Sequence, residues 1–240
     1  LLEGGLLIVQ AGGAKGALLA LDAASGKENW RWKGDSSAYS SPVIGTFGGT
    51  KQVVFLTADQ VVGVDLSNGT LAWKTPLRTS MMQSNMMTPV IADGTVIYSG
   101  ENKGVTAARP KRDQNGAWSL EQVWLNAEVS FTMSSPVRTD RLLFGMTPRN
   151  KGQLVCLDPT SGKTLWKGPP RQGENAALLL LDTFLLTLTN EGQLILMKPS
   201  GDSYQEVRRH QVANTETWAH PIPTAQGVIV KDLDSVALWQ

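Results

Sequence analysis

The chain has 240 residues, of which 41% are hydrophobic and 18% are charged. This composition is typical of a folded globular protein and excludes an intrinsically disordered chain. Lysine and arginine total 22 against 21 acidic residues, a net charge of +1, which argues against the basic face that nucleic-acid binding requires. The most apolar stretch, 176–189, is interrupted by Asp182 and is shorter than the roughly 20 residues of a transmembrane helix.

A short charged segment and a single cysteine are the first local features. The segment 109–113 contains three basic residues and Asp113, and we interpret it as a solvated loop. Cys156 is the only cysteine, which excludes an internal disulfide and a CxxC-type zinc site. Because its neighbours are apolar, Cys156 is predicted to be a small buried residue and not a reactive thiol.

An Asp-x-x-x-Gly-x-x-x-Trp pattern repeats along the chain. Three gapless copies begin at Ala20, Gly63 and Cys156, and degenerate copies begin at Ala107 and Leu196. The copy at Ala107 carries an insertion before its tryptophan. A second marker, a proline followed by an apolar residue, precedes most copies, and its prolines at positions 42, 89 and 136 recur at equal intervals.

Each repeat reads as four short strands separated by glycine, proline, asparagine and aspartate. A repeat of about 45 residues with four strands is typical of an all-β β-propeller with four-stranded antiparallel blades. In the motif, Asp can accept hydrogen bonds from its own turn, and Gly supplies a residue with positive φ. The tryptophans of the outermost strand are predicted to pack against the next blade: Trp30, Trp73, Trp124 and Trp166.

These motifs resemble the tryptophan-docking repeat of the PQQ-like (pyrroloquinoline quinone-like) β-propellers, over about residues 6–240. The segments 171–177 and 218–221 most resemble the secreted bacterial PQQ-binding-like β-propeller repeat proteins. The superfamily includes quinoprotein alcohol dehydrogenases and the lipoprotein scaffold of the bacterial outer-membrane assembly machine. The resemblance implies an extracytoplasmic location, periplasmic or secreted, although this chain contains no signal peptide.

The resemblance also implies a ring of eight blades, and we expect one propeller domain over 1–240 that contains about five and a half of them. The first unit is expected to begin with its second strand and the last to end with its third, so that blades are missing upstream. Unpaired edges would then favour self-association. The predicted segments are a partial blade 1–39, blades 40–85, 86–132, 133–174 and 175–217, and a partial blade 218–240.

No residue pattern predicts catalysis. A quinoprotein dehydrogenase, by resemblance, needs a calcium cluster, a catalytic aspartate and a disulfide of adjacent cysteines, and one cysteine cannot form the last. His210 and His220 lack metal-ligand spacing. The methionines at 81, 82, 86, 87 and 133 have no histidine or cysteine beside them, which favours packing over copper binding. We therefore predict no catalytic residue, no metal and no cofactor.

The loops near the inner strands are the candidate binding surface, because loops on a rigid scaffold carry function. Arg171, beside Glu174, could pair with an anionic ligand, and Trp218 could stack on a ring. His220 precedes a repeat proline, at a position that faces the channel in propellers. The alternative is that these side chains cross-link neighbouring blades. The candidates are Asn85, Glu101, Asn102, Arg149, Asn150, Arg171, Gln172, Glu174, Asn175, Trp218 and His220.

The sequence therefore favours a non-catalytic extracytoplasmic scaffold or binding propeller whose ligand is a protein or peptide, with carbohydrate as a further option. The alternative is an oxidoreductase of the alcohol or sugar dehydrogenase kind. That enzyme would depend on PQQ with calcium, and its site would be completed by blades upstream of this chain.

Overall fold

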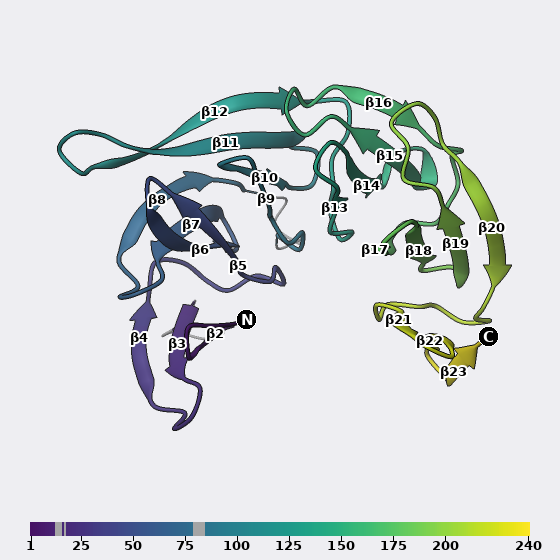
Figure 1. The fold of residues 1–240 in the computed structure, drawn as a ribbon, viewed down its shortest axis with the longest axis horizontal. Helices are drawn as coiled ribbons and strands as arrows, with labels where there is room; N and C mark the ends of the chain where they lie inside the picture. The colour runs from purple at the N-terminus through teal and green to yellow at the C-terminus, as the bar shows by residue number, and fades with distance from the viewer. Residues whose placement is uncertain (13–15, 17, 79–84) are drawn as a thin grey trace. The chain divides into compact units, whose positions relative to one another are not determined.

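In the computed structural model, the described residues are 1–12, 16, 18–78 and 85–240. The chain forms two compact units, Leu1–Thr132 and Met133–Gln240. The strands of the described residues form six antiparallel sheets, five with four strands and one with three (Figure 1). Over the same ranges, no helix is long and apolar enough to cross a membrane. The chain is an all-β protein of propeller blades, as predicted.

The first unit, which we call unit 1, contains three of these sheets, and each pairs its strands in chain order. The first consists of β1 (Leu2–Glu3), β2 (Leu6–Gln10), β3 (Leu18–Asp22) and β4 (Glu28–Trp32). The second consists of β5 (Val43–Phe47), β6 (Thr50–Leu56), β7 (Gln60–Asp65) and β8 (Leu71–Pro76). The third consists of β9 (Val90–Ala92), β10 (Thr95–Ser99), β11 (Val105–Arg112) and β12 (Trp118–Asn126).

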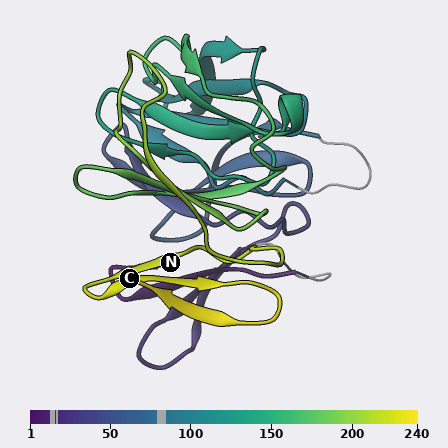
Figure 2. The same ribbon diagram turned by 90° about the vertical axis from the view of Figure 1, so that its right-hand side faces the viewer.

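The second unit, unit 2, contains the other three sheets. The first consists of β13 (Val137–Arg138), β14 (Leu143–Thr147), β15 (Gln153–Leu157) and β16 (Thr164–Lys167). The next consists of β17 (Ala176–Leu180), β18 (Leu185–Thr189), β19 (Gln193–Met197) and β20 (Glu206–Gln211). The last has three strands, β21 (Ile222–Thr224), β22 (Gly227–Lys231) and β23 (Val236–Trp239), drawn in yellow in Figure 2.

The turn of the motif has the same geometry in its three gapless copies. The amide of Gly26 donates to the carbonyl of Asp22 at 2.8 Å, and the amide of Asp22 donates to the carbonyl of Lys27 at 2.8 Å. Gly26 has φ of 71°, a left-handed conformation that glycine adopts at least cost. The Asp22 carboxylate accepts from the Ser25 amide at 2.7 Å, and the Ser25 hydrogen bonds lower the pKa of Asp22. Asp65 and Asp158 form equivalent turns.

The tryptophan of each fourth strand lies opposite a small residue of the third strand. The cross-strand pairs are Ala20 with Trp30, Gly63 with Trp73, Ala107 with Trp124, and Cys156 with Trp166. A Cβ atom on Gly63 would come within 2.3 Å of the Trp73 ring. A small residue is therefore required where the indole covers the strand. Cys156 fills this role as a buried residue, as predicted, and burial, followed by the charge of Asp158, raises its pKa to about 12.

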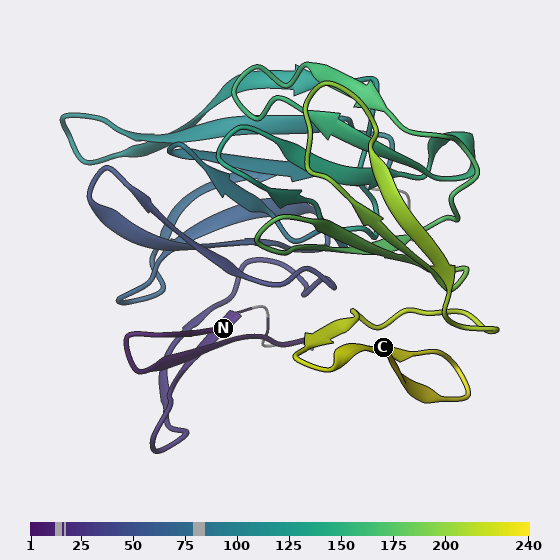
Figure 3. The same cartoon turned by 45° about the vertical axis from the view of Figure 1, so that its right-hand side comes forward.

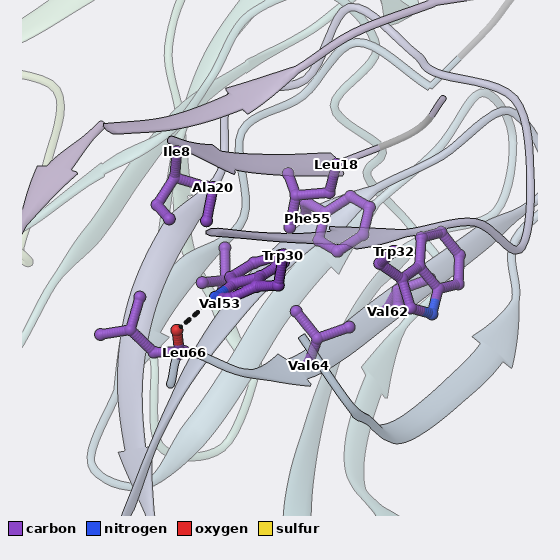
Figure 4. Packing of buried hydrophobic residues seen from close by; sticks show 10 residues of the cluster. All are labelled: Ile8, Leu18, Ala20, Trp30, Trp32, Val53, Phe55, Val62, Val64 and Leu66. Atoms are coloured by element: carbon purple, nitrogen blue, oxygen red, sulfur yellow. Dashed lines mark hydrogen bonds between the residues drawn. The ribbon is translucent and has the colours of Figure 1, made fainter. Parts of the chain in front are cut away.

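Trp30 joins the first sheet to the second. Its Nε1 donates to the Leu66 carbonyl at 2.9 Å (Figure 4). The ring is 7% exposed in a cluster that includes Ile8 and Val53 from the two sheets. In unit 2, Trp166 repeats this contact by donating to the Ser200 carbonyl at 2.7 Å. Trp30 and Trp166 thus each contact the next sheet of their own unit.

The first sheet differs from the expectation that its inner strand would be missing. Leu2 pairs with Leu7 and Glu3 with Leu6, so β1 supplies a fourth strand. Gly4 and Gly5 have φ of 56° and 78°, and two successive positive φ angles form the tight turn that suits a two-residue hairpin. A strand of two residues has no periodicity to detect, which is why the sequence pattern missed it.

The charged segment 109–113 is also not the solvated loop that was expected. Residues 109–112 belong to β11, which pairs with β12 in a long hairpin (Figures 1 and 3). The Arg112 guanidinium carbon lies 5.7 Å from the centre of the Trp118 ring, and Lys111 forms an ion pair with Glu121. Trp118 and Leu120 pack against a hydrophobic cluster that contains residues of both the β5–β8 and the β9–β12 sheets, and so contact residues far apart in the sequence.

Candidate functional site

Four loops of unit 2 are joined by backbone hydrogen bonds. The amide of Arg171 donates to the Asn150 carbonyl at 3.0 Å, which joins the turn after β14 to the loop before β17. The amide of Asn190 donates to the Asn175 carbonyl at 2.9 Å, and the amide of Thr217 donates to the Asn190 carbonyl at 3.0 Å. Segments 148–152, 170–175, 189–192 and 214–220 therefore form one connected surface, which we call the unit 2 rim.

Two glycines bring the first loops of the rim close together. A Cβ atom on Gly152 would lie 1.5 Å from the Gly173 carbonyl oxygen, and one on Gly173 would lie 2.6 Å from Asn190 Oδ1. Both glycines are buried and have positive φ, 87° and 95°. Any larger residue at either position would separate the loops.

Some amide side chains of the rim act as cross-links, which was the structural alternative in the sequence analysis. Asn175 Oδ1 accepts from the Ser134 hydroxyl at 2.6 Å. The Asn190 side chain accepts at Oδ1 from the Asn175 backbone amide at 3.1 Å. The Gln172 Oε1 accepts from Arg209 at 2.7 Å, and Asn150 Nδ2 donates to Gln153 at 3.1 Å. These side chains hold the loops in place.

The charged candidates of the rim are exposed. Arg149, Arg171 and Glu174 are all solvent-accessible, and so is Lys151, which the sequence analysis did not select. Arg171 has φ of 62° and Lys151 has φ of 60°, a conformation that costs a residue with a side chain about 1–2 kcal/mol. Lys151 follows Asn150 in the same turn, and this adjacency is the signal that could have identified it.

Trp218 is the most exposed aromatic residue of the rim. The side chain is 50% exposed, and its Nε1 donates to Glu216 Oε2 at 3.0 Å. His220 is also exposed and precedes β21. In contrast to Trp30 and Trp166, Trp218 contributes its ring to the surface and not to a core.

Arg209 on β20 is a positioning residue that sequence reasoning missed. Its guanidinium binds Glu206 at 2.8 and 3.0 Å, the Tyr204 hydroxyl at 3.2 Å, Gln172 at 2.7 Å, and also Gln193. The bond from Arg209 lowers the pKa of Glu206. Burial, and then the bond to Glu206, raise the pKa of Tyr204. The network attaches the loop that contains Arg171 to the outer strand, a contact that no spacing in the sequence predicts.

The unit 1 candidates lie apart in sequence from this rim. Asn85 is 1% exposed, and its Nδ2 donates to the carbonyls of Thr57 and Leu77, each at 2.9 Å. It therefore links two loops internally. Asn102 is an exposed turn residue with φ of 55°, beside the half-buried Glu101. The structure places Asn85 against Gly100, next to these two residues.

A calcium-bound quinone requires several carboxylate, amide and carbonyl oxygens at one point. Within residues 1–12, 16, 18–78 and 85–240, no group of three or more His, Cys, Asp or Glu side chains converges in this way. Met87 is buried, whereas Met81 and Met82 lie outside the described residues.

Comparison with known proteins identifies the family. The family model described as outer membrane protein assembly factor BamB matches residues 1–168. The chain belongs to this BamB-like family. No curated protein matches it. Among solved structures, the computationally designed Ika8 protein is 14% identical with a TM-score of 0.60, over 100% of this chain and 81% of that one. This likeness concerns the fold alone.

A second designed protein, Ika4, is 16% identical, and the match covers 73% of this chain and 99% of that chain with a TM-score of 0.49. For the BamB-like chain described here, the family match and the sheets agree on a PQQ-like repeat architecture.

Proposed function

We propose that this chain is a non-catalytic, extracytoplasmic scaffold that binds a protein or peptide through the unit 2 rim. The observation that carries the proposal is that some rim side chains cross-link the loops whereas others are exposed to solvent. The side-chain amides of Gln172 and Asn175 are occupied by cross-links, whereas Arg171 and Glu174 stand exposed on the loop that these cross-links hold. Trp218 is exposed on the loop that the Thr217 amide joins to Asn190. Rigid loops with exposed charged and aromatic groups suit protein recognition.

The family description supports the same proposal. The matching family is named for an outer membrane protein assembly factor, and an assembly factor acts through other proteins. A location outside the cytoplasm follows from that description as part of the proposal.

A capture experiment tests the proposal. Purified protein carrying Arg171→Ala, Glu174→Ala or Trp218→Ala would be compared with the unsubstituted protein for capture of envelope proteins. The main captured protein would then be purified and its affinity measured. We expect each substitution to weaken binding by about tenfold, since exposed aromatic and arginine residues carry much of the binding energy of an interface. Lys163→Ala, an exposed residue of a motif turn in the same unit, is the control.

Unchanged affinity in all three variants would remove the unit 2 rim as the binding surface. The oxidoreductase alternative has its own readout. Addition of PQQ and calcium would shift the visible absorption band and allow dye reduction if the protein bound the quinone, and this result would overturn the non-catalytic proposal.

A further inference from the structure

The unit 2 rim separates its charges into two ends. One end carries three cations on the first two loops, Arg149, Lys151 and Arg171, and no acidic residue occurs in segments 148–152 or 170–172. All three are exposed. The hydrogen bond from the Arg171 amide to Asn150 holds these two loops together. This end is therefore a cationic surface whose geometry the backbone fixes.

The other end is acidic and aromatic. Glu174 is exposed at the far end of the loop that contains Arg171, and Glu191 and Glu216 are exposed on the loops that follow. Glu191 lies against Gly173, with its Cγ 3.5 Å from a Cβ built there. The Glu216 carboxylate accepts from the Trp218 indole at 3.0 Å. No lysine or arginine occurs in segments 189–192 or 214–218. An indole face beside carboxylates is a site that attracts a cationic side chain.

The two ends lie close together. Gly152 and Gly173 are buried against each other, and Glu191 lies against Gly173. An extended peptide could therefore reach both ends at once. Charge complementarity then specifies its side chains.

We infer that the segment recognised by the unit 2 rim is a peptide with acidic residues at one end and a lysine or arginine at the other. The acidic residues meet Arg149, Lys151 and Arg171. The cationic residue lies over Trp218 beside Glu216. This inference rests on the proposed function and specifies the chemistry of its partner.

The test uses two fluorescein-labelled octapeptides of equal composition, followed by fluorescence anisotropy at low and high salt. The first, Asp-Glu-Asp-Gly-Ser-Gly-Lys-Lys, has separated charges, and the second has the same residues with the charges alternating. We expect the separated peptide to bind at least about tenfold more tightly, with affinity that falls as salt increases. Equal affinity of the two peptides, or binding of neither, would overturn the inference.

Variants of the rim test which part of the peptide each end binds. Arg171→Glu should weaken binding of the charge-separated peptide about tenfold. In the double variant Arg171→Glu with Lys151→Glu, a peptide with lysine in place of its acidic residues should recover binding. Trp218→Ala should weaken peptides that contain the lysines and leave a peptide with glutamines in their place unchanged. Lys163→Glu, which makes the same charge change outside the rim, is the control, and circular dichroism verifies folding of each variant.

The result separates the two proposals. If the purified envelope partner binds in a manner that depends on Arg171 and Trp218, but the charge-swapped peptide does not recover binding, the peptide chemistry is wrong and the scaffold function stands. If the partner's affinity does not depend on the rim, the proposed function itself fails.

Discussion

The Trp30 indole donates a hydrogen bond to the Leu66 carbonyl, 2.9 Å away in the turn of the next sheet. The same ring lies against Gly69, where a Cβ atom would come within 2.5 Å of it. One repeat therefore supplies the ring and the next supplies both the acceptor and the space. This relationship links the tryptophan of one motif to the glycine of the following motif.

Replacement of Trp30 should destabilise unit 1. Trp30→Ala removes a buried aromatic side chain and should lower the free energy of unfolding by about 3–5 kcal/mol. Urea denaturation followed by circular dichroism measures this change. The matched control is Trp218→Ala, because that ring is 50% exposed, and its effect should stay within about 0.5 kcal/mol. Similar losses in both variants would contradict the packing role of Trp30.

The two motif glycines Gly26 and Gly69 offer a comparison that isolates this contact. They have nearly the same φ, 71° and 70°, so alanine at either position incurs the same backbone strain of about 1–2 kcal/mol. At Gly26 nothing lies within 4 Å of the new Cβ, whereas at Gly69 the Trp30 ring does. We expect Gly69→Ala to be the more destabilising by at least about 1 kcal/mol in urea denaturation. Equal losses would show that the turn conformation alone requires glycine.

Asp35 should make stability dependent on pH. Burial opposes ionisation of Asp35, but hydrogen bonds from Thr57, the amides of Asp59 and Ser36, and Gln60 outweigh it and lower its pKa. A lowered pKa in the folded state contributes stability above the unfolded pKa of about 3.9, and that stability is lost as pH falls through the folded value. Urea midpoints measured from about pH 6 to pH 2.5 should fall less steeply for Asp35→Asn. Parallel curves for the two proteins would exclude this contribution.

The thiol of Cys156 should report opening of unit 2. Because the thiol is buried and its pKa is raised to about 12, a disulfide reagent should modify it at pH 8 only as fast as the surrounding sheets open. We expect fast labelling in urea and slow labelling in the native protein. Rapid native labelling would contradict the burial of Cys156 beneath Trp166.

Steric tolerance at Cys156 can be tested in the same protein. Cys156→Leu should destabilise by about 1–3 kcal/mol, because a larger side chain must displace the indole opposite it. Leucine occurs naturally at the equivalent position 196, where β20 places Arg208 opposite it instead of a tryptophan. Cys156→Ala, which matches Ala20 and Ala107, should change stability much less, and thermal denaturation compares the two variants.

The repeat predicted most of the strands because its residues act within one hairpin or between consecutive hairpins. Asp22, Gly26 and Lys27 close their own turn, and such local bonds leave a fixed spacing in the sequence. β1 was missed because its pairing depends on the conformation of Gly4 and Gly5, not on any periodicity. The extension of the β11–β12 hairpin through residues 109–112 was missed because it depends on Trp118 and Leu120, which pack on a cluster that residues of the β5–β8 sheet help to form.

For the candidate site, the sequence identified most of the loops but not the state of each side chain. Asn85 and Arg171 were equivalent candidates, yet Asn85 is buried between two carbonyls and Arg171 is exposed. Spacing could not separate them, since burial of a loop residue depends on which neighbouring loop covers it. Arg209 was overlooked because its contact with Gln172 joins residues far apart in the sequence.

The sequence by itself determined the blade architecture, because Asp, Gly and Trp at constant spacing serve a turn, a left-handed residue and a contact with the following sheet. Only the tertiary structure decided which polar residues cross-link the loops and which remain exposed. Arg209 reaches Gln172, and Gly152 meets Gly173, across long intervals of sequence. Such contacts form only when the folded sheets come close together, so the spacing of residues along the sequence does not predict them.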